Sequence, residues 1–339
     1  GVLVFDPSGF PKSGGESVGV ARQWCGRLGQ VDNCQVAIYL GYVSHKGHNL
    51  VDTRLYLPKE WTKDKVRLDK AGVPKAYRGY RTRHQLALEM LAKNGAWLPH
   101  GWIAGADERG RPYWFRRRLA ALGERYMLAV PSNTAIRDLE VQPPEYSGRG
   151  RRPQRPWQNV TVWSQSLAVE AWQRIDVRDG SKGPLVVEAL KRRVVSRTHR
   201  RQQGDEEMLV VMRYRDRDQE QVVKVDYYLS NALPKMPLGE FARVAKAEHR
   251  IEECLQRSKS EAGLADYEVR NWTGWQHHHT LSLLATWFLV RETDRGKKMD
   301  PCDDLTADSP GHRHNLARGV SVRHDAAYAH GAPEALATQ

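Results

Sequence analysis

The sequence predicts an α/β fold in which helices flank a mixed β-sheet. Short apolar runs alternate with Gly, Pro, Asp and Asn turns over residues 2–43, a pattern typical of strands. Residues 102–131 follow a strand–helix–strand order, and residues 238–260 and 275–292 have the composition of two helices. Strands and helices that follow one another in this way indicate the α/β class.

Three strands are expected at the beginning of the chain, over residues 2–6, 17–25 and 34–43. Because short turns connect them, we expect them to form an antiparallel meander. The first strand is expected to end at Asp6, which directly follows four apolar residues. Residues 44–80 are polar, and we expect them to be irregular.

A helix is predicted over residues 82–94, where apolar residues recur at helical spacing and Thr82 is a possible cap. A short strand is then expected at residues 102–104. A helix over residues 113–122 and a buried strand over residues 125–131 complete the strand–helix–strand unit.

The middle of the chain predicts a basic, β-rich insertion over residues 141–235. Residues 141–157 are rich in Pro, Gly and Arg, so we expect a basic loop or linker there. Apolar and polar residues alternate in several places over residues 160–230, which favours strands. The long helix at residues 238–260 follows, and the more apolar segment at 275–292 is expected to be a buried helix.

Four regions are therefore expected along the chain. Residues 1–140 form the first part of a catalytic core, residues 141–235 the insertion, and residues 236–295 the helices that complete the core. Residues 296–339 show no period of 3.6 or 2 and are expected to be an irregular, disordered tail, which an out-of-frame origin would explain. Because Gly1 is not an initiator Met, we expect that a preceding segment is missing.

The charge balance points to a polyanionic partner. Lys and Arg total 53 against 40 Asp and Glu, giving a net charge of +13 and a pI of about 9.6. Such an excess favours nucleic acid, although a solvated basic surface is the alternative. The four cysteines are scattered without a CxxC pair, which argues against a zinc ribbon and for a reducing compartment. No apolar run is long enough to cross a membrane.

Three acidic residues lie where separate elements could bring them together. Asp6 follows the first strand, Asp107 lies just past another strand, and Glu252 lies on the long predicted helix. Carboxylate oxygens are the ligands that Mg²⁺ prefers, so the three predict a divalent cation site, although each alone could be an ordinary cap or surface group. Lys259 follows Glu252 by about two helical turns, so both project from one face, where the lysine could hold a phosphate.

Three stretches together resemble the DDE transposases of bacterial insertion sequences, whose catalytic core is ribonuclease H-like. They are VFDPSGFPKSGGESVGVARQWCGRLG, GWIAGADERGRPYWFRRRL and RIEECLQRSKSEAGLADYEVRNWTGW. The resemblance implies a β-rich insertion between the second and third acids. It also implies Mg²⁺ or Mn²⁺ as cofactor, with Asp6, Asp107 and Glu252 as ligands and Lys259 as a DNA contact. The implied partner is double-stranded DNA bound by a homodimer, in the bacterial cytoplasm at the nucleoid.

Two positions depart from the resemblance. Counting back from Glu108 or Gly110 by the family's spacing gives Ala106 for the second acid, so Asp107 would serve through a shift of one residue. The family's Tyr and Arg before the third acid would fall at Ala245 and Glu248, and Arg250 could stand in for the arginine.

Several basic and aromatic residues are expected to contact DNA. The candidates for contacts to the DNA backbone are several arginines, the arginine-rich loop and the segment Lys191–Arg193. An aromatic ring beside a basic residue could stack on a base. The alternatives are solvated faces for the basic residues and a cap on the core for the aromatic ring. Besides Lys259 and Arg250, the candidates are Arg116, Arg117, Arg270 and Trp272.

The sequence therefore favours a transposase that cleaves and joins DNA strands at insertion-sequence ends with a divalent metal. The alternative is a catalytically inactive DNA-binding remnant of such an enzyme, which Ala106 favours. A basic nuclease of unrelated fold is a third interpretation, which the motif on the long helix disfavours.

Overall fold

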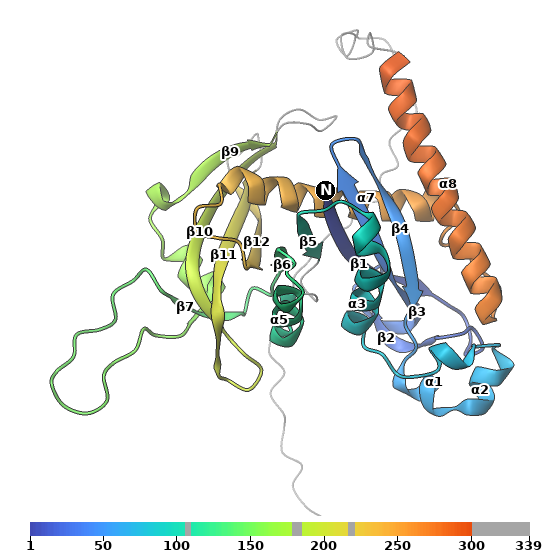
Figure 1. The fold of residues 1–339 in the computed structure, drawn as a ribbon, viewed down its shortest axis with the longest axis horizontal. Helices are drawn as coiled ribbons and strands as arrows, with labels where there is room; N and C mark the ends of the chain where they lie inside the picture. Colours follow the sequence, from blue (N-terminus) through green and yellow to red (C-terminus); the bar gives the residue numbers. More distant parts are fainter. Residues whose placement is uncertain (106–109, 178–184, 216–220, 300–339) are drawn as a thin grey trace, which may run out of the picture. The chain divides into compact units, whose positions relative to one another are not determined.

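A single mixed sheet of twelve strands runs through the part of the chain that the computed structural model describes, residues 1–105, 110–177, 185–215 and 221–299 (Figure 1). Gly1–Thr293 form one unit, and the fold below is that of this unit. Ten strands follow one another across the sheet: β2 (Ala21–Cys25), β3 (Gln30–Ser44), β1 (Val2–Pro11), β5 (Trp102–Gly105), β6 (Tyr126–Ala129), β12 (Val222–Ser230), β11 (Gln203–Arg215), β10 (Leu185–Arg197), β7 (Ala135–Asp138) and β8 (Gln158–Asn159). In addition, β4 (Gly47–Leu55) pairs with β3 and β9 (Gln173–Val177) pairs with β10.

The pairings make the sheet mixed, as the sequence predicts. Strand β5 lies parallel to both β1 and β6, whereas the other pairs are antiparallel. The expected meander is wrong, because β1 pairs with β3 and β3 with β2. The first strand also does not end at Asp6. It continues to Pro11, because residues 6–11 pair with residues 34–39 of β3. The pairing of β1 with its parallel neighbour β5 ends at Phe5, which lies opposite Gly105. Asp6 is therefore the first residue of β1 beyond that pairing.

The segment expected to be irregular, residues 44–80, is mostly ordered into regular elements. It contains β4, then α1 (Lys59–Lys63) and α2 (Lys65–Lys70), followed by the short helix η1 (Lys75–Tyr77). Two apolar side chains explain the order. Trp61 and Leu68 are buried, and the indole nitrogen of Trp61 donates a hydrogen bond of 2.7 Å to the carbonyl of Val20. Isolated apolar residues in a polar segment thus fix two short helices against the core.

The predicted helix and strand that follow are confirmed. Helix α3 (Arg83–Asn94) begins with a capping box, in which Thr82 and Gln85 exchange hydrogen bonds with each other's backbone amides. The short helix η2 (Gly95–Trp97) leads into β5, and α5 (Tyr113–Ala121) and β6 complete the strand–helix–strand unit.

The β-rich segment is not a separate layer but extends the same sheet. Strand β12 pairs with β6, so β10, β11 and β12 continue outward from the parallel strands. The predicted loop at residues 141–157 contains no helix or strand. The short helices α6 (Val160–Gln165) and η3 (Val169–Ala171) lie between β8 and β9.

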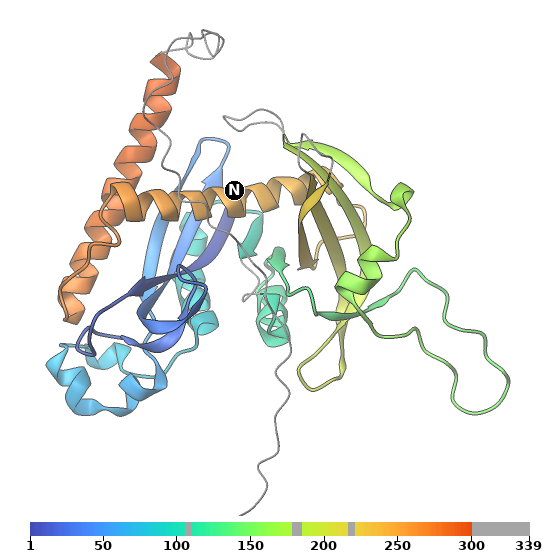
Figure 2. The same cartoon turned by 180° about the vertical axis from the view of Figure 1, so that it is seen from behind.

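The helix α7 (Leu238–Glu261) crosses the sheet and contacts strands from both halves, including β1, β5 and β10 (Figures 1 and 2). Val2 and Val4 of β1 belong to the same apolar core as residues of α7, whereas Leu3 and Phe5 point into a second core with residues of α3 and α5. The helix lies close to β3 because that strand has Gly41 at the crossing. A Cβ there would lie 2.5 Å from Cδ1 of Ile251.

The second long helix, α8 (Trp272–Met299), is confirmed as a helix but is not fully buried. His279, Thr286 and Val290 face the core. Leu281 and Phe288 are 65% and 59% exposed, so the expectation of a buried helix is wrong. The expected tail begins inside α8 at residue 296, and its residues 300–339 lie outside the described residues. None of the described helices is long and apolar enough to cross a membrane.

Candidate active site

Asp6 lies on the face of the sheet that α7 covers. Side chains alternate along a strand, and Val2 and Val4 both pack into the core shared with α7. Asp6 follows them in the same alternation and is partly buried. Its partner across the ladder is Tyr39, which belongs to that same core. The first predicted acid therefore faces the helix that carries the third.

Helix α7 presents Glu252 and Lys259 on one face, as the spacing predicts. The side chain of Glu252 is 75% exposed, and His249 Nδ1 lies 3.7 Å from its Oε2. This contact is the main cause of a lowered pKa for the Glu252 carboxyl, to which the charges of Lys224 and Lys259 add. Glu252 is thus a carboxylate at neutral pH, open to solvent and able to take up a cation.

Lys259 is close to Asp6 as well as to Glu252. Its Nζ lies 5.8 Å from the ring centroid of Phe10 on β1, and the side chain is partly buried. Burial lowers the pKa of Lys259, and the negative charge of Asp6 acts in the opposite direction. The lysine therefore lies at the edge of the acidic face, where it could hold a phosphate oxygen near the carboxylates.

Glu248 is a further carboxylate at this place that the sequence reasoning missed. It lies one helical turn before Glu252, and its Oε2 is buried without a hydrogen-bond partner in the described part of the chain. Burial, together with the negative charges of Asp6 and of Asp226 on β12, raises the pKa of Glu248 to about 8. The spacing of four residues from Glu252 was the available signal, because such residues share a helix face.

The described carboxylates fit a divalent cation by their chemistry but do not complete a site. Asp6, Glu248 and Glu252 offer oxygen ligands, and the unpartnered Glu248 oxygen would gain a partner from a cation. Within the described residues, no three His, Cys, Asp or Glu side chains lie close enough together to hold a metal ion. Asp107 and Ala106 lie outside the described residues.

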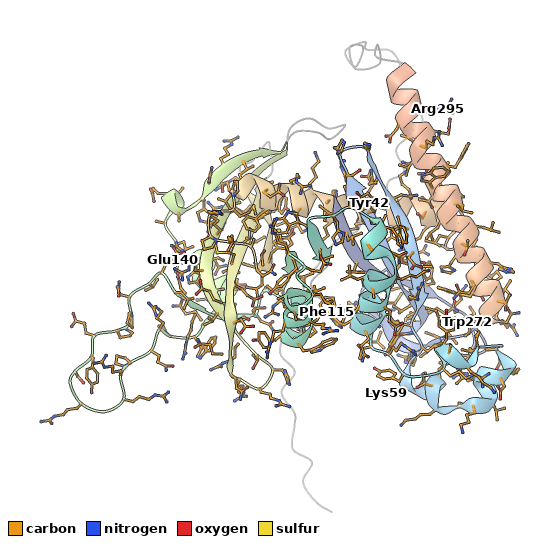
Figure 3. All side chains as sticks on the ribbon, in the orientation of Figure 1. Tyr42, Lys59, Phe115, Glu140, Trp272 and Arg295 are labelled. Carbon is orange, nitrogen blue, oxygen red and sulfur yellow. The ribbon has the colours of Figure 1, made fainter. Side chains whose placement is uncertain are left out.

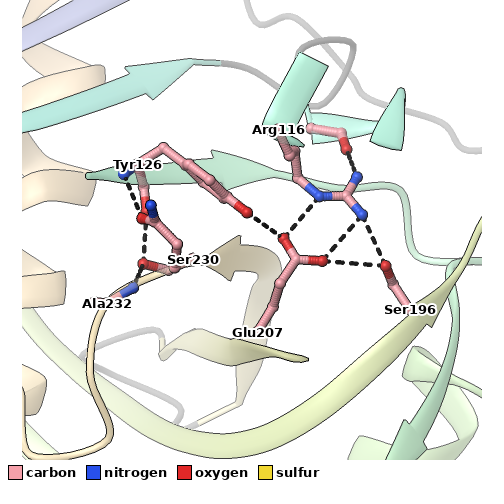
Figure 4. Close-up of polar contacts among 8 residues, drawn as sticks. Arg116, Tyr126, Ser196, Glu207, Ser230 and Ala232 are labelled. Carbon is pink, nitrogen blue, oxygen red and sulfur yellow. Dashed lines mark hydrogen bonds and ion pairs between the residues drawn. The ribbon is translucent and has the colours of Figure 1, made fainter. Parts of the chain in front are cut away.

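Arg116 is not available for contact with DNA, because its side chain is buried and takes part in a network of hydrogen bonds (Figure 4). Its guanidinium donates to both carboxylate oxygens of Glu207, at 2.8 and 3.1 Å, and to Ser196 at 2.7 Å. A further hydrogen bond joins it to the carbonyl of Gly110, and the Tyr126 hydroxyl donates to Glu207 at 2.6 Å. This network connects α5 and β6 to β10 and β11, so the role of Arg116 is structural.

Trp272, which is labelled next to α8 in Figure 3, is likewise part of the core. Its ring centroid lies 5.0 Å from that of Tyr77 and 6.4 Å from that of Trp275, which is itself fully buried. Its backbone amide donates to the carbonyl of Ala71 at 2.8 Å. The alternative, that this tryptophan caps the core, accounts for its position, and base stacking does not.

The remaining predicted DNA contacts fall into two groups. Arg117 and Arg270 are exposed and Arg250 is partly exposed, so their side chains can reach a ligand. The segment Lys191–Arg193 is satisfied within the protein. Lys191 donates to the carbonyls of Pro234 and Met236, Arg192 pairs with Glu140 at 2.8 Å, and Arg193 pairs with Glu206 at 2.7 Å.

A comparison with models of known protein families gives a match. A family model described as DDE superfamily endonuclease matches residues 1–184, slightly more than half of the chain. The match includes the strand that carries Asp6 and the segment that contains Asp107, and it ends before α7. No curated protein matches the chain.

Proposed function

The chain belongs to the DDE superfamily of endonucleases, and on that basis we propose that it is a transposase. In this proposal it cleaves DNA strands at the ends of an insertion sequence and joins the freed ends to target DNA. The observation that carries the proposal is the placement of Asp6 on β1 and Glu252 on α7 on one face, with Lys259 beside them. The mixed sheet around β1 supports a ribonuclease H-like core.

Asp6 and Glu252 would hold Mg²⁺ or Mn²⁺, with Asp107 as the third ligand and Glu248 beside them. A bound divalent cation activates water and stabilises the charge that develops on the phosphate. The carboxylates supply oxygen ligands from two rigid elements, which keeps the positions of those ligands fixed. Helix α7 packs closely on Gly41 of β3, the strand that pairs with β1.

Lys259 would orient the DNA end. Its ammonium is a point charge that can bind a phosphate oxygen, and its partial burial limits the number of positions it can take. Arg117, Arg250 and Arg270 would add contacts to the DNA backbone. Pairing of two transposon ends needs two active sites, so we propose that two copies act together on DNA.

The inactive remnant is the second candidate, and Ala106 is the observation that favours it. If the family's spacing is strict, the second acid is missing and no complete cation site forms. A chain of this kind would bind DNA equally with and without Mg²⁺.

Nicking of supercoiled plasmid in Mg²⁺ or Mn²⁺ separates the two candidates. The comparison uses the chain itself, the variants Asp6→Asn and Ala106→Asp, and Glu253→Gln as a control next to Glu252. We expect the chain and the control to nick and Asp6→Asn to be inactive. Nicking that appears only in Ala106→Asp would show that this copy is a remnant. No nicking by any of them, with DNA binding intact, would contradict the endonuclease assignment.

A further inference from the structure

Two arginines from separate strands stack on one tryptophan near the edge of the sheet formed by β7 and β8, several strands away from β1 and Asp6. The guanidinium carbons of Arg137 and Arg197 lie 4.4 and 4.8 Å from the ring centroid of Trp157. The sheet explains how they meet. Arg137 lies on β7, next to β10, which ends at Arg197, and the antiparallel register of β7 with β8 places Trp157 opposite Arg137.

Within the described residues, the charges at this place are not neutralised by ion pairs. In the described part of the chain, no carboxylate forms an ion pair with Arg137, Arg197 or the loop residue Arg151. Arg137 donates to the neutral oxygen of Gln203 at 3.2 Å, while its Nε is buried without a hydrogen-bond partner among the described residues. Burial lowers the pKa of Arg137, and the positive charges of Arg197 and Arg151 lower it further. In the described part of the chain, three like charges therefore act on one another without an ion-paired counter-charge.

Neighbouring arginines on the same strand behave in the opposite way. Arg192 pairs with Glu140, and Arg193 pairs with Glu206 across the β10–β11 ladder. Both are therefore balanced within the protein, only a few residues from Arg197. The lack of counter-charge is a property of the group around Trp157 and not of basic strands in general.

We propose that Arg137 and Arg197, stacked on Trp157, form together with the loop residue Arg151 a binding site for the phosphate backbone of duplex DNA, separate from the carboxylate site. The proposal rests on the proposed function in taking DNA as the ligand. Guanidinium groups bind phosphate through two parallel hydrogen bonds, and stacking on Trp157 holds two of them in a fixed orientation. Such contacts fix the position of a duplex without reading its sequence.

The position of this arginine cluster determines which part of a bound duplex it can contact. Ile136 packs in the core on the side of the sheet away from α7, so by alternation Arg137 faces the same side as Asp6. Six strand spacings separate β1 from β7. At about 4.8 Å each they span at most about 29 Å along the sheet. With a rise of about 3.4 Å per base pair, a duplex held at both sites would be contacted about eight base pairs from the cut.

The test is DNA binding measured by fluorescence anisotropy in EDTA, with a duplex of about 30 base pairs and salt from about 50 to 200 mM. Each phosphate contact contributes about 0.9 to the slope of log K against log salt. We expect the double variant Arg137→Gln/Arg197→Gln to lose about 2 from this slope, and its affinity to fall on the order of tenfold. Arg193→Gln is the matched control, because Arg193 is exposed on the same strand and already paired.

Arg151→Gln guards against a folding defect, because Arg151 is exposed in a loop. It should lose about 1 from the slope without any change in melting temperature. Slopes equal to that of the unmodified chain in both sets of variants would overturn the proposal. So would poly-glutamate that displaces the duplex as well as competitor DNA does at equal charge. Because EDTA removes the metal, loss of this site and failure of the nuclease assignment give separate results.

Discussion

Two regions of the sheet, one at β1 and the other at β7, gather charges of opposite sign. At β1 and α7, the charges of Asp6 and Glu252 act on Glu248, whose Oε2 is buried without a hydrogen-bond partner among the described residues. At β7 and β10, arginines come together around Trp157 without a carboxylate in the described part of the chain. Like charges held close together raise the free energy of the protein until a ligand of opposite charge binds.

The network between these two regions shows the contrast. The buried Arg116 and Glu207 neutralise each other and are further hydrogen-bonded to Ser196 and Tyr126. No ligand is needed there, and the pair connects elements of the sheet. Charges that are paired within the protein thus have a structural role. Charges without such a partner among the described residues lie at the two places where we propose that a cation and a phosphate bind.

The largest expected effect is at the acidic side. Asp6→Asn or Glu252→Gln should reduce DNA cleavage on the order of 10³-fold, because each removes a charged ligand for the metal that stabilises the reacting phosphate. Binding of DNA in EDTA should change little in either variant. Cleavage rates measured against Glu253→Gln, an exposed neighbour on the same helix, provide the check. Cleavage that survives Asp6→Asn would remove Asp6 from the site.

The next effect concerns the balanced pair. Glu207→Gln should lower the free energy of unfolding by about 3–5 kcal/mol, because it leaves the buried Arg116 without its counter-charge. Urea unfolding measures this loss. Glu206→Gln is the control, since its pair with Arg193 is half exposed and should contribute less than about 1 kcal/mol. A loss in Glu207→Gln no larger than in the control would show that the pair is not structural.

Gly41→Ala should affect the acidic site at β1 and α7 without affecting the arginine cluster at β7 and β10. The added Cβ would lie against the side chain of Ile251, so we expect a loss of about 2 kcal/mol in unfolding free energy and a displaced α7. Cleavage should fall because Glu252 moves, while the double change Arg137→Gln/Arg197→Gln should still lower the salt slope of DNA binding by about 2 in this background. The second change Ile251→Val should restore part of the lost stability and cleavage. A smaller loss of salt slope in this background would mean that the arginine cluster depends on α7.

The smallest effect is a pH dependence from His279 on α8. Its ring is buried against Trp275, at 4.0 Å between centroids, and burial lowers the pKa of His279 to about 3. The folded state therefore keeps His279 neutral, while the unfolded state takes up a proton below about pH 6.5. This contribution to stability is complete above that pH and is lost as the pH falls towards 3.

At about pH 5.5 the loss from His279 should be about 1.4 kcal/mol. His279→Gln should flatten the dependence of unfolding free energy on pH between about 5 and 7, and His277→Gln, at an exposed position on the same helix, should not. Equal pH dependence in both variants would contradict a neutral, buried His279.

Local signals predicted much of the fold. The capping box at Thr82 and the periodic apolar residues of α3 and α7 are properties of short segments, so they can be recognised in the sequence. The shared face of Glu252 and Lys259 follows from helix geometry alone. The ends of β1 could not be predicted this way, because they depend on pairing with β3, about 30 residues later.

The features that could not be predicted from the sequence depend on contacts between residues that are far apart in the chain. Arg116 looks like a surface arginine until Glu207, 91 positions later, is brought beside it. Glu248 looks like an ordinary helix carboxylate until β1 and β12 bring Asp6 and Asp226 near it. A basic run likewise does not show which arginines are paired, as Arg193 and Arg197 on one strand demonstrate.

Equilibrium binding of Mn²⁺ tests the central claim most directly, because it needs neither DNA nor turnover. Free Mn²⁺ is followed by electron paramagnetic resonance as the ion is titrated into the chain, into Asp6→Asn and into Glu253→Gln. The unmodified chain and Glu253→Gln should bind the ion with equal affinity, and Asp6→Asn should bind it on the order of tenfold more weakly or worse. Equal Mn²⁺ affinity in all three would show that the acidic face of β1 and α7 is not a metal site.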